Sequence, residues 1–271
     1  MNAIDRRRAW RDVGAVDVRG VLDPATCGRV NDAIDRTRRN PSEHYARLSP
    51  AGAAVVDSDL FRWLDDDVIA DVVQRGPLPA LAASILDEPA VVFVEDQWLA
   101  SAPGASTGSP WHQDAPYYNI DGEFVTLWVA LDDAGRDAAL RVVEGSHRGP
   151  IFAPVEFATT KATIGEDESE VRLPPPLDPE ADGATVVRWS VAPGDVVALH
   201  SGVLHAAGGA AGADRWFRRL SLRYARPDAR YVDRGPTAAT FWRTLPHGLE
   251  DGDPLACAIF PLIDVTQSWP S

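Results

Sequence analysis

The sequence predicts a mainly β fold with flanking helices, on two observations. From residue 90 to about residue 224, short segments rich in β-branched and aromatic residues alternate with stretches rich in Gly, Pro and Asp, as strands and their connections do. Before residue 90, apolar residues recur instead at helical spacing. Strands at this density are typical of a sandwich or a barrel.

Helical patterns are expected in the first 89 residues. Asp23-Pro24 is a favourable helix start, with Asp as the N-cap and Pro at the first helical position, and the pattern that follows ends in a basic cluster. A second helical pattern begins near Ser58 or Asp59 and is stopped by Gly76-Pro77, and a third covers residues 79–86. We expect these helices to form a scaffold beside the strands.

The strands follow as a series along the rest of the chain. They are expected over residues 91–99, 124–131, 140–143, 185–189, 196–200 and 217–224. No internal repeat and no sharp change of composition divides the sequence. We therefore expect one domain over residues 1–271, made of a mainly helical N-terminal scaffold (1–89), a β core (90–230) and a C-terminal extension (231–271).

Composition restricts the classes of function. The chain is 45% hydrophobic and 24% charged, as in globular proteins, and no apolar stretch of about 18 residues suggests a membrane span. Its formal net charge of -14 argues against nucleic acid as a partner, because binding to phosphates needs clustered Lys and Arg. The N-terminus has no apolar run after its basic residues, so we expect a cytoplasmic protein.

Cysteine is scarce in this sequence. Only Cys27 and Cys257 are present, far apart along the chain, which excludes a thiolate metal cluster and gives no sign of a disulfide framework. Both are expected to be reduced and to act as small apolar residues. Any bound metal would have to be held by histidine and carboxylate side chains.

One short segment places an imidazole and a carboxylate two residues apart. Residues i and i+2 of a strand point to the same face, so His112 and Asp114 could bind one ion together. Two histidines and one carboxylate on one side of a metal leave three positions open, as in non-haem Fe(II) oxygenases. A second histidine is therefore required.

The second histidine has two candidates. Three of the others lie in segments that predict a loop, a turn and the C-terminal tail: His44, His147 and His247. His200 and His205 remain, and both come shortly after a Pro-Gly-Asp turn and a hydrophobic strand. The residues alone leave the choice between them open.

Six segments, in this order, resemble the successive landmarks of the phytanoyl-CoA dioxygenase family. They are Trp111-His112-Gln113-Asp114, Leu127–Asp132, Leu140–Arg148, Pro193–Ala198, Leu204–Gly208 and Arg218–Tyr224. Order and spacing match over about residues 90–230. The resemblance implies a double-stranded β-helix, the jelly-roll of two facing sheets, with Fe(II) as the metal, 2-oxoglutarate as the co-substrate and O₂ as the oxidant.

The resemblance also implies the metal ligands. His112 and Asp114 match the family's first two ligands and His205 matches its distal ligand, which leaves His200 as a neighbour. These three residues are the predicted catalytic metal site. Because Asp114 is present, halogenation is disfavoured, since halogenating relatives replace this carboxylate to make room for halide.

Co-substrate residues are less well determined by the resemblance. The family's Arg, whose planar fork suits a carboxylate, lies about 11 to 14 residues after the distal ligand, and the register here is imperfect. Arg218 and Arg219 are the nearest candidates, and Arg215 is a third. Gln97 matches a polar position that contacts the co-substrate in related sequences, and Thr126 lies on the inward pattern of its strand.

The substrate is expected to be a small, largely apolar metabolite. Trp111 and Tyr117 flank the predicted ligands and could line an apolar cleft, because pockets are lined mainly by apolar and aromatic groups. The acidic, Pro-rich stretch over residues 153–185 is long for a loop, and it is either a cover for the site or an ordinary solvated insertion.

The predicted activity is hydrogen abstraction from the substrate followed by hydroxylation, with release of succinate and CO₂. Cyclisation, epimerisation and desaturation remain open as other outcomes of hydrogen abstraction. Two further alternatives are a jelly-roll metal-binding or sensor protein without turnover and a metal-dependent hydrolase or isomerase. The sequence does not determine the oligomeric state.

Overall fold

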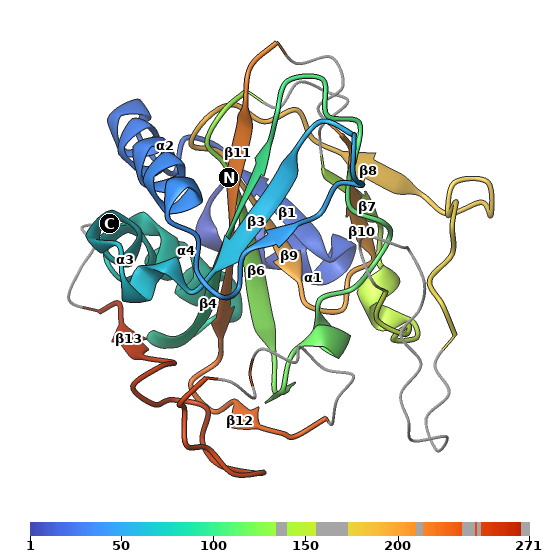
Figure 1. The fold of residues 1–271 in the computed structure, drawn as a ribbon. Helices are drawn as coiled ribbons and strands as arrows, with labels where there is room; N and C mark the ends of the chain where they lie inside the picture. Colours follow the sequence, from blue (N-terminus) through green and yellow to red (C-terminus); the bar gives the residue numbers. More distant parts are fainter. Residues whose placement is uncertain (134–139, 156–172, 210–213, 235–241, 243–244, 267–271) are drawn as a thin grey trace.

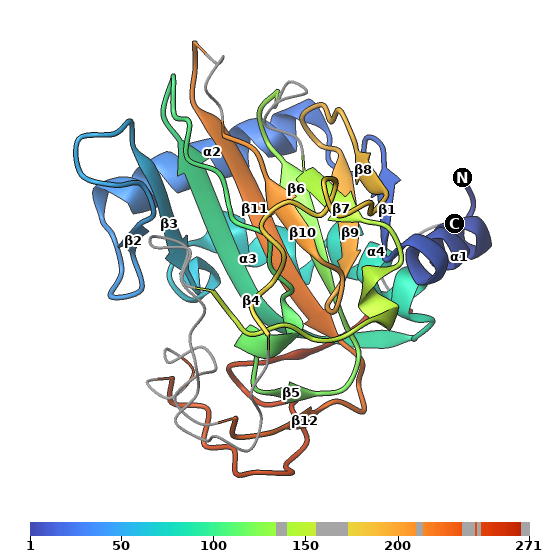
Figure 2. The same ribbon diagram turned by 90° about the vertical axis from the view of Figure 1, so that its right-hand side faces the viewer.

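Two antiparallel sheets form the centre of the protein in the computed structural model, which describes residues 1–133, 140–155, 173–209, 214–234, 242 and 245–266 (Figures 1 and 2). The strands are β1 Ala15–Val18, β2 Ala46–Arg47, β3 Val56–Leu60, β4 Ala90–Ser101, β5 Ile120–Asp121, β6 Phe124–Ala130, β7 Leu140–Val143, β8 Val186–Arg188, β9 Val196–His200, β10 His205–Ala207, β11 Phe217–Ala225, β12 Arg230–Tyr231 and β13 Leu262–Asp264.

The major sheet has the order β1-β9-β6-β11-β4-β3-β2, with β13 paired to β4. The minor sheet has the order β10-β7-β8, and β12 and β5 form a separate pair. Figure 2 shows the minor sheet in front of the major one, so that the two sheets face each other. This is the jelly-roll arrangement that the family resemblance implies, and the predicted fold class is confirmed.

Helices cover the other face of the major sheet. They are α1 Ala3–Val13, α2 Pro24–Arg39, α3 Asp67–Gln74 and α4 Pro77–Leu86, and α2, α3 and α4 lie behind the sheet in Figure 2. The predicted start of α2 is confirmed, because the Asp23 side chain caps the helix by accepting a hydrogen bond from the Thr26 N–H at 3.0 Å.

The main apolar core lies between these helices and the major sheet. Strand β11 shows how the sheet separates two environments, because Leu220, Leu222 and Tyr224 are buried in the core with residues of α2, α3 and α4. The alternate residues of β11 point to the opposite face, toward the minor sheet. The central strand therefore contributes its even-numbered side chains to stability and its odd-numbered side chains to the space between the sheets.

The helix expected to begin near Ser58 or Asp59 is corrected by the structure. Val56–Leu60 is strand β3, which pairs with β4 and places Ser58 opposite Leu99. A 3₁₀ turn, Arg62–Leu64, follows, and α3 begins only at Asp67. The apolar spacing read as one helix spans three elements, and Asp66 supplies the N-cap of the true helix.

The six predicted strands are otherwise confirmed, each to within two residues at either end. Strand β1 was not predicted, because four residues of an edge strand carry too short a pattern to be recognised. Residues 156–172, most of the acidic stretch expected to be a cover or an insertion, lie outside the described residues. No helix in the described part of the chain is both long and apolar enough to cross a membrane.

The Pro-Gly-Asp turn before β9 is joined by hydrogen bonds to the segment between β1 and α2. The Asp195 carboxylate accepts hydrogen bonds from the Ala192 and Gly20 N–H groups and from Arg19 Nη1, each at 2.8 Å. Gly194 has a φ of 90°, and a side chain there would meet the Leu22 carbonyl oxygen. Burial alone would raise the pKa of Asp195, but these hydrogen bonds lower it overall.

We expect Asp195→Ala to destabilise the protein by about 1–3 kcal/mol at neutral pH, because several charge-assisted hydrogen bonds are lost. The folded-state pKa lies below that of the unfolded chain. The contribution is therefore present above the unfolded value of about 4 and is lost as the pH falls below it. Urea unfolding at neutral pH and at about pH 3 measures the free energy of unfolding of both proteins. If wild type and variant differed in this free energy by the same amount at both pH values, the prediction would be contradicted.

Candidate metal centre

The backbone brings His112 and His205 together. The two residues form an isolated antiparallel bridge, in which each N–H donates to the other's carbonyl oxygen at 2.9 Å. His205 is the first residue of β10, and His112 lies in the segment between β4 and β5. Their rings lie 4.2 Å apart between centroids. A main-chain contact thus fixes the separation of the two imidazoles.

Each imidazole is oriented by a second main-chain contact. Nδ1 of His112 lies 2.8 Å from the Pro110 carbonyl oxygen, and Nδ1 of His205 lies 3.0 Å from that of Val203. A carbonyl oxygen accepts only, so Nδ1 carries the proton in both rings. The lone pair of each ring is then on Nε2, the nitrogen available to a metal, which is the usual arrangement of metal-binding histidines.

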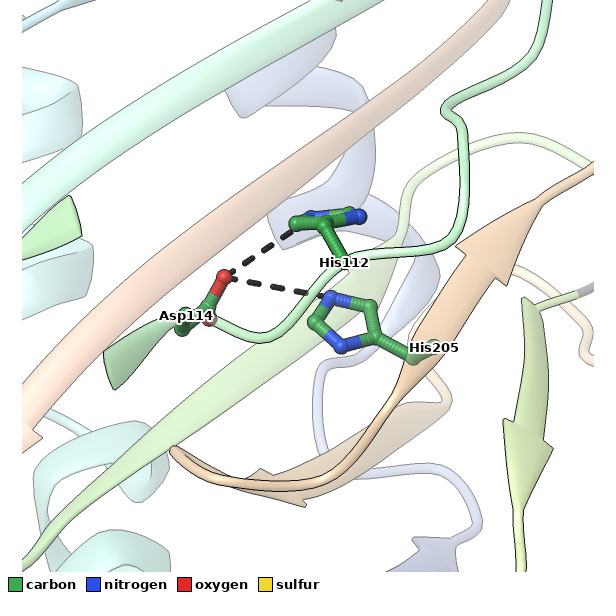
Figure 3. A group of neighbouring side chains, drawn as sticks. All are labelled: His112, Asp114 and His205. Carbon is green, nitrogen blue, oxygen red and sulfur yellow. Dashed lines mark ion pairs between the residues drawn. The ribbon is translucent and has the colours of Figure 1, made fainter. Parts of the chain in front are cut away.

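Asp114 completes a group of three ligand residues (Figure 3). Its Oδ1 lies 3.8 Å from Nε2 of His112 and 3.8 Å from Nε2 of His205. The three ligand atoms lie within 4.8 Å of one another, and all three residues are buried. Among the described residues, this is the one group of His, Cys, Asp and Glu side chains that is arranged to hold a metal ion.

The charges of the group also suit a divalent metal. Burial and the neighbouring His205 lower the pKa of His112 to about 3, so this imidazole is neutral at neutral pH. Burial would raise the pKa of Asp114, but the positive charge of Arg223 and the adjacent histidines lower it overall. Two imidazoles and one carboxylate on one side of an ion fit Fe(II) with three positions left open.

The ligands open onto a cavity of about 350 Å³ between the two sheets. One part of its wall is apolar and contains Leu60, Leu99, Tyr117, Trp128, Leu140, Val155 and Leu199. Another part is polar and contains Glu95, Gln97, Arg219, Ser221 and Arg223. The last three are alternate residues of β11, on the face opposite the apolar core.

Arg219 and Arg218 lie on opposite faces of β11. Arg219 lines the cavity, is only 5% exposed and donates to Ser101 Oγ at 3.1 Å. It has no carboxylate partner among the described residues, and burial lowers its pKa to about 10, so it stays cationic at neutral pH. Arg218 instead pairs with Asp132 at 2.8 Å and with Asp35 at 2.9 Å, on the helix side.

The third candidate, Arg215, is exposed and pairs with its neighbour Asp214. His200, the alternative ligand, also lies outside the metal group. Its Nε2 is 3.7 Å from Glu123 Oε1, and its ring packs against Trp10 and His147. The geometry therefore separates His200 from the cavity and directs it toward α1.

The other predicted site residues are divided between the cavity and its surroundings. Gln97 and Tyr117 line the cavity, and the Tyr117 hydroxyl donates to the Val155 carbonyl oxygen at 2.8 Å. Thr126 does not line it but donates to Asp114 Oδ2 at 2.5 Å. Trp111 packs on the outward side of the minor sheet, in a cluster with Val143, and Arg141 lies over its ring. Trp111 therefore does not reach the cavity.

Sequence reasoning missed two charged residues of the site. Arg223 Nη1 donates to Glu95 Oε1 at 3.1 Å, and both side chains are buried in the cavity wall. Burial raises the pKa of Glu95 to about 7, although Arg223 and the Tyr118 hydroxyl oppose this shift. A signal for Arg223 was available, because it lies four residues after Arg219 in one strand and so shares its face.

Comparison with known proteins decides the family. The family model for phytanoyl-CoA dioxygenase (PhyH) matches residues 10–220. The chain belongs to this family. Members of the PhyH family depend on Fe(II) and 2-oxoglutarate, so the predicted family, enzyme class and cofactors are confirmed. No curated protein matches the sequence at a significant level.

Three solved structures illustrate the similarity of this chain to known folds. The epimerase SnoN, crystallised with Fe³⁺, alpha ketoglutarate and nogalamycin RO, is 22% identical, with a TM-score of 0.77 over 96% of this chain and 98% of SnoN. The alpha ketoglutarate dependent carbocyclase SnoK from nogalamycin biosynthesis is 19% identical, with a TM-score of 0.76 over 97% and 98%. AviO1 from Streptomyces viridochromogenes Tue57 is 25% identical, with a TM-score of 0.62 over 84% and 96%.

We expect His112→Ala and His205→Ala to abolish stoichiometric Fe(II) binding, because each removes one of three protein ligands. His200→Ala should retain it, since His200 faces Glu123 and α1. Anaerobic equilibrium dialysis followed by iron analysis measures the bound metal, and circular dichroism checks that each variant is folded. Loss of iron with His200→Ala, or its retention with His205→Ala, would contradict this assignment.

Proposed function

We propose that this member of the PhyH family abstracts a hydrogen atom from a small, largely apolar metabolite and hydroxylates it. The carrying observation is a buried group of two histidines and one aspartate that opens onto a cavity with an uncompensated arginine. When bound, Fe(II) and 2-oxoglutarate supply O₂ activation and hydrogen abstraction, with succinate and CO₂ as co-products. The protein's residues bind, orient and shield these groups.

In this proposal, His112, Asp114 and His205 hold the metal. The main-chain bridge and the two carbonyl contacts at Nδ1 fix both rings before the metal arrives. Such preorganisation removes most of the reorganisation that binding would otherwise require. The three protein ligands leave positions for the two donor atoms of the co-substrate and for O₂.

Arg219 is proposed to bind the distal carboxylate of 2-oxoglutarate. A buried cation without a counter-charge costs several kcal/mol, and no described carboxylate pairs with Arg219. A carboxylate that enters the cavity would remove this cost and would accept hydrogen bonds from a planar fork. The Ser221 hydroxyl in the same wall is an additional donor, and Ser101 Oγ holds the guanidinium by accepting from Arg219 Nη1. Gln97, in that wall, remains a co-substrate candidate.

The substrate is proposed to enter along the apolar part of the cavity wall. Tyr117 is fixed there by two contacts with Val155, since its hydroxyl donates to the carbonyl oxygen and accepts from the N–H. The Tyr117 ring also lies edge-on to His112, with 6.1 Å between centroids. Apolar and aromatic walls favour an apolar ligand and exclude water from a reactive centre.

A second outcome of hydrogen abstraction is kept as an alternative. SnoN is described as an epimerase and SnoK as a carbocyclase, and both share the fold over almost the whole of this chain. Epimerisation or ring closure needs the same metal group and co-substrate site as hydroxylation. The two readings therefore differ in the fate of the substrate radical, and product analysis separates them.

The first test of the proposal is co-substrate turnover. We expect the purified protein with Fe(II), O₂ and 2-oxoglutarate to release succinate, slowly without a substrate and faster with one, because the proposed metal ligands and the proposed co-substrate arginine line one cavity. Liquid chromatography with mass detection measures succinate, and the His205→Ala protein is the control. A wild-type rate equal to that control with every substrate offered would favour a metal-binding protein without turnover.

The role of Arg219 predicts a change in ligand-induced stabilisation. With Mn(II) bound and 2-oxoglutarate at 100 times its Kd, stabilisation by about 2.7 kcal/mol corresponds to a Tm increase of roughly 5 °C for a chain of this length. We expect Arg219→Met to lose most of this increase, whereas Arg218→Met retains it because Arg218 faces the helices. Differential scanning calorimetry with and without 2-oxoglutarate measures both. An unchanged increase in Arg219→Met would assign the carboxylate to another residue.

A further inference from the structure

The two carboxylate oxygens of Asp114 face different partners. Oδ1 lies 3.8 Å from Nε2 of each ligand histidine, so it faces the metal position. Oδ2 accepts a hydrogen bond from Thr126 Oγ1 at 2.5 Å and lies 3.9 Å from Nε of Arg223. The hydrogen-bond length is typical of a hydroxyl that donates to a charged carboxylate. One oxygen of the carboxylate therefore faces the metal position, and the other faces Thr126 and Arg223.

Thr126 and Arg223 belong to the interior of the major sheet. They are direct cross-strand partners in β6 and β11, and each of these strands has a neighbour on both sides. Thr126 is also paired with Leu199 of β9. The main chain of such strands cannot shift far without breaking ladder hydrogen bonds, so the point from which each side chain extends is fixed. The position that they offer to Oδ2 is therefore fixed by the sheet.

Arg223 is itself held in place from the other side. Its Nη1 donates to Glu95 Oε1 at 3.1 Å, to Gln97 Oε1 at 3.2 Å and to the Ser221 carbonyl oxygen at 3.1 Å. Its Nε is buried and has no hydrogen-bond acceptor. A buried donor without an acceptor is unfavourable, so the guanidinium attracts Oδ2 of Asp114 toward itself.

We propose that Thr126 and Arg223 keep Oδ2 of Asp114 off the metal, so that Asp114 binds through Oδ1 alone. The inference rests on the proposed function, because it takes His112, Asp114 and His205 as the metal ligands. Carboxylates bind metals through one oxygen or two. A second oxygen from Asp114 would occupy one of the three open positions that the co-substrate and O₂ share. Thr126 and Arg223 are thus positioning residues that keep the site open.

The test uses Co(II) as a spectroscopic probe in place of Fe(II) in the full-length protein. Thr126→Val removes the hydroxyl at nearly constant volume, releases Oδ2 and lets it bind the ion. We expect a changed Co(II) visible absorption spectrum and a Kd for 2-oxoglutarate about 10-fold or more higher, measured by calorimetry on the Co(II)-loaded protein. Thr126→Ser restores the donor and should restore both properties.

Arg223→Met is an independent second variant, which should shift the spectrum in the same direction. Thr37→Val is the matched control, because Thr37 is a buried threonine of α2 whose hydroxyl donates to the Ile34 carbonyl oxygen. Wild-type spectra and 2-oxoglutarate affinities in both Thr126→Val and Arg223→Met would overturn the inference. So would a folded Thr126→Val protein that binds no Co(II), because Thr126 would then be required for metal binding itself.

Failure of the proposed function has a different signature. If the unaltered protein bound no Co(II), the assignment of the metal ligands would be wrong, and the inference about Thr126 and Arg223 would be wrong as well. If the unaltered protein bound Co(II) and 2-oxoglutarate but the variants did not differ from it, the proposed function would stand. Only the role of Thr126 and Arg223 would then be wrong.

Discussion

The alternation of side chains along β11 is the constraint on which the site depends. This strand lies between β6 and β4 in the major sheet, with the helix-side core on one face and the cavity between the sheets on the other. One face must be apolar to pack against the helices, and Leu220 and Leu222 satisfy this requirement. The other face, with Arg219 and Arg223, is buried between the sheets. A shift of one residue would place guanidinium groups in the core.

Burial of two arginines in this way is unfavourable unless anions compensate them, and the site compensates each arginine differently. Arg223 has Glu95 at 3.1 Å and Asp114 at 3.9 Å, both from the protein. Among the described residues, Arg219 has only uncharged partners, the Ser101 hydroxyl at 3.1 Å and the Phe217 ring at 5.1 Å. The arginine that is paired within the protein supports the metal ligand, whereas the unpaired one is available to an incoming carboxylate.

Much of the fold and the metal group could be predicted from the sequence, since strand patterns and the spacing of His112, Asp114 and His205 within family landmarks are local features. The arginine could not be assigned, because a count of residues from His205 does not say which face of β11 is inward. The apolar residues Leu220 and Leu222 indicate which arginine faces the cavity, since they place Arg219 on the opposite face from the core.

The outward orientation of the Trp111 side chain can be explained by the same alternation of side chains. Adjacent residues of an extended chain point to opposite sides, so an inward His112 requires an outward Trp111, as its contact with Arg141 shows. The contact between Thr126 and Asp114 could not be predicted in this way. It joins β6 to a segment outside the ladder, and no periodicity in either segment indicates that the two side chains meet.

The Glu95–Arg223 pair reconciles two requirements of a divalent metal site. A cation near the metal orients Asp114, but alone it would repel the ion and weaken binding in a poorly solvated interior. Glu95, directly across from Arg223 in β4, lies 3.1 Å from the guanidinium and balances its charge when ionised, while Nε of Arg223 remains 3.9 Å from Asp114 Oδ2. The pair can therefore fix the carboxylate while adding little net charge. A neutral donor such as Thr126 needs no such balance, and its Oγ1 lies 2.5 Å from Oδ2, whereas Nε of Arg223 lies 3.9 Å from the same oxygen.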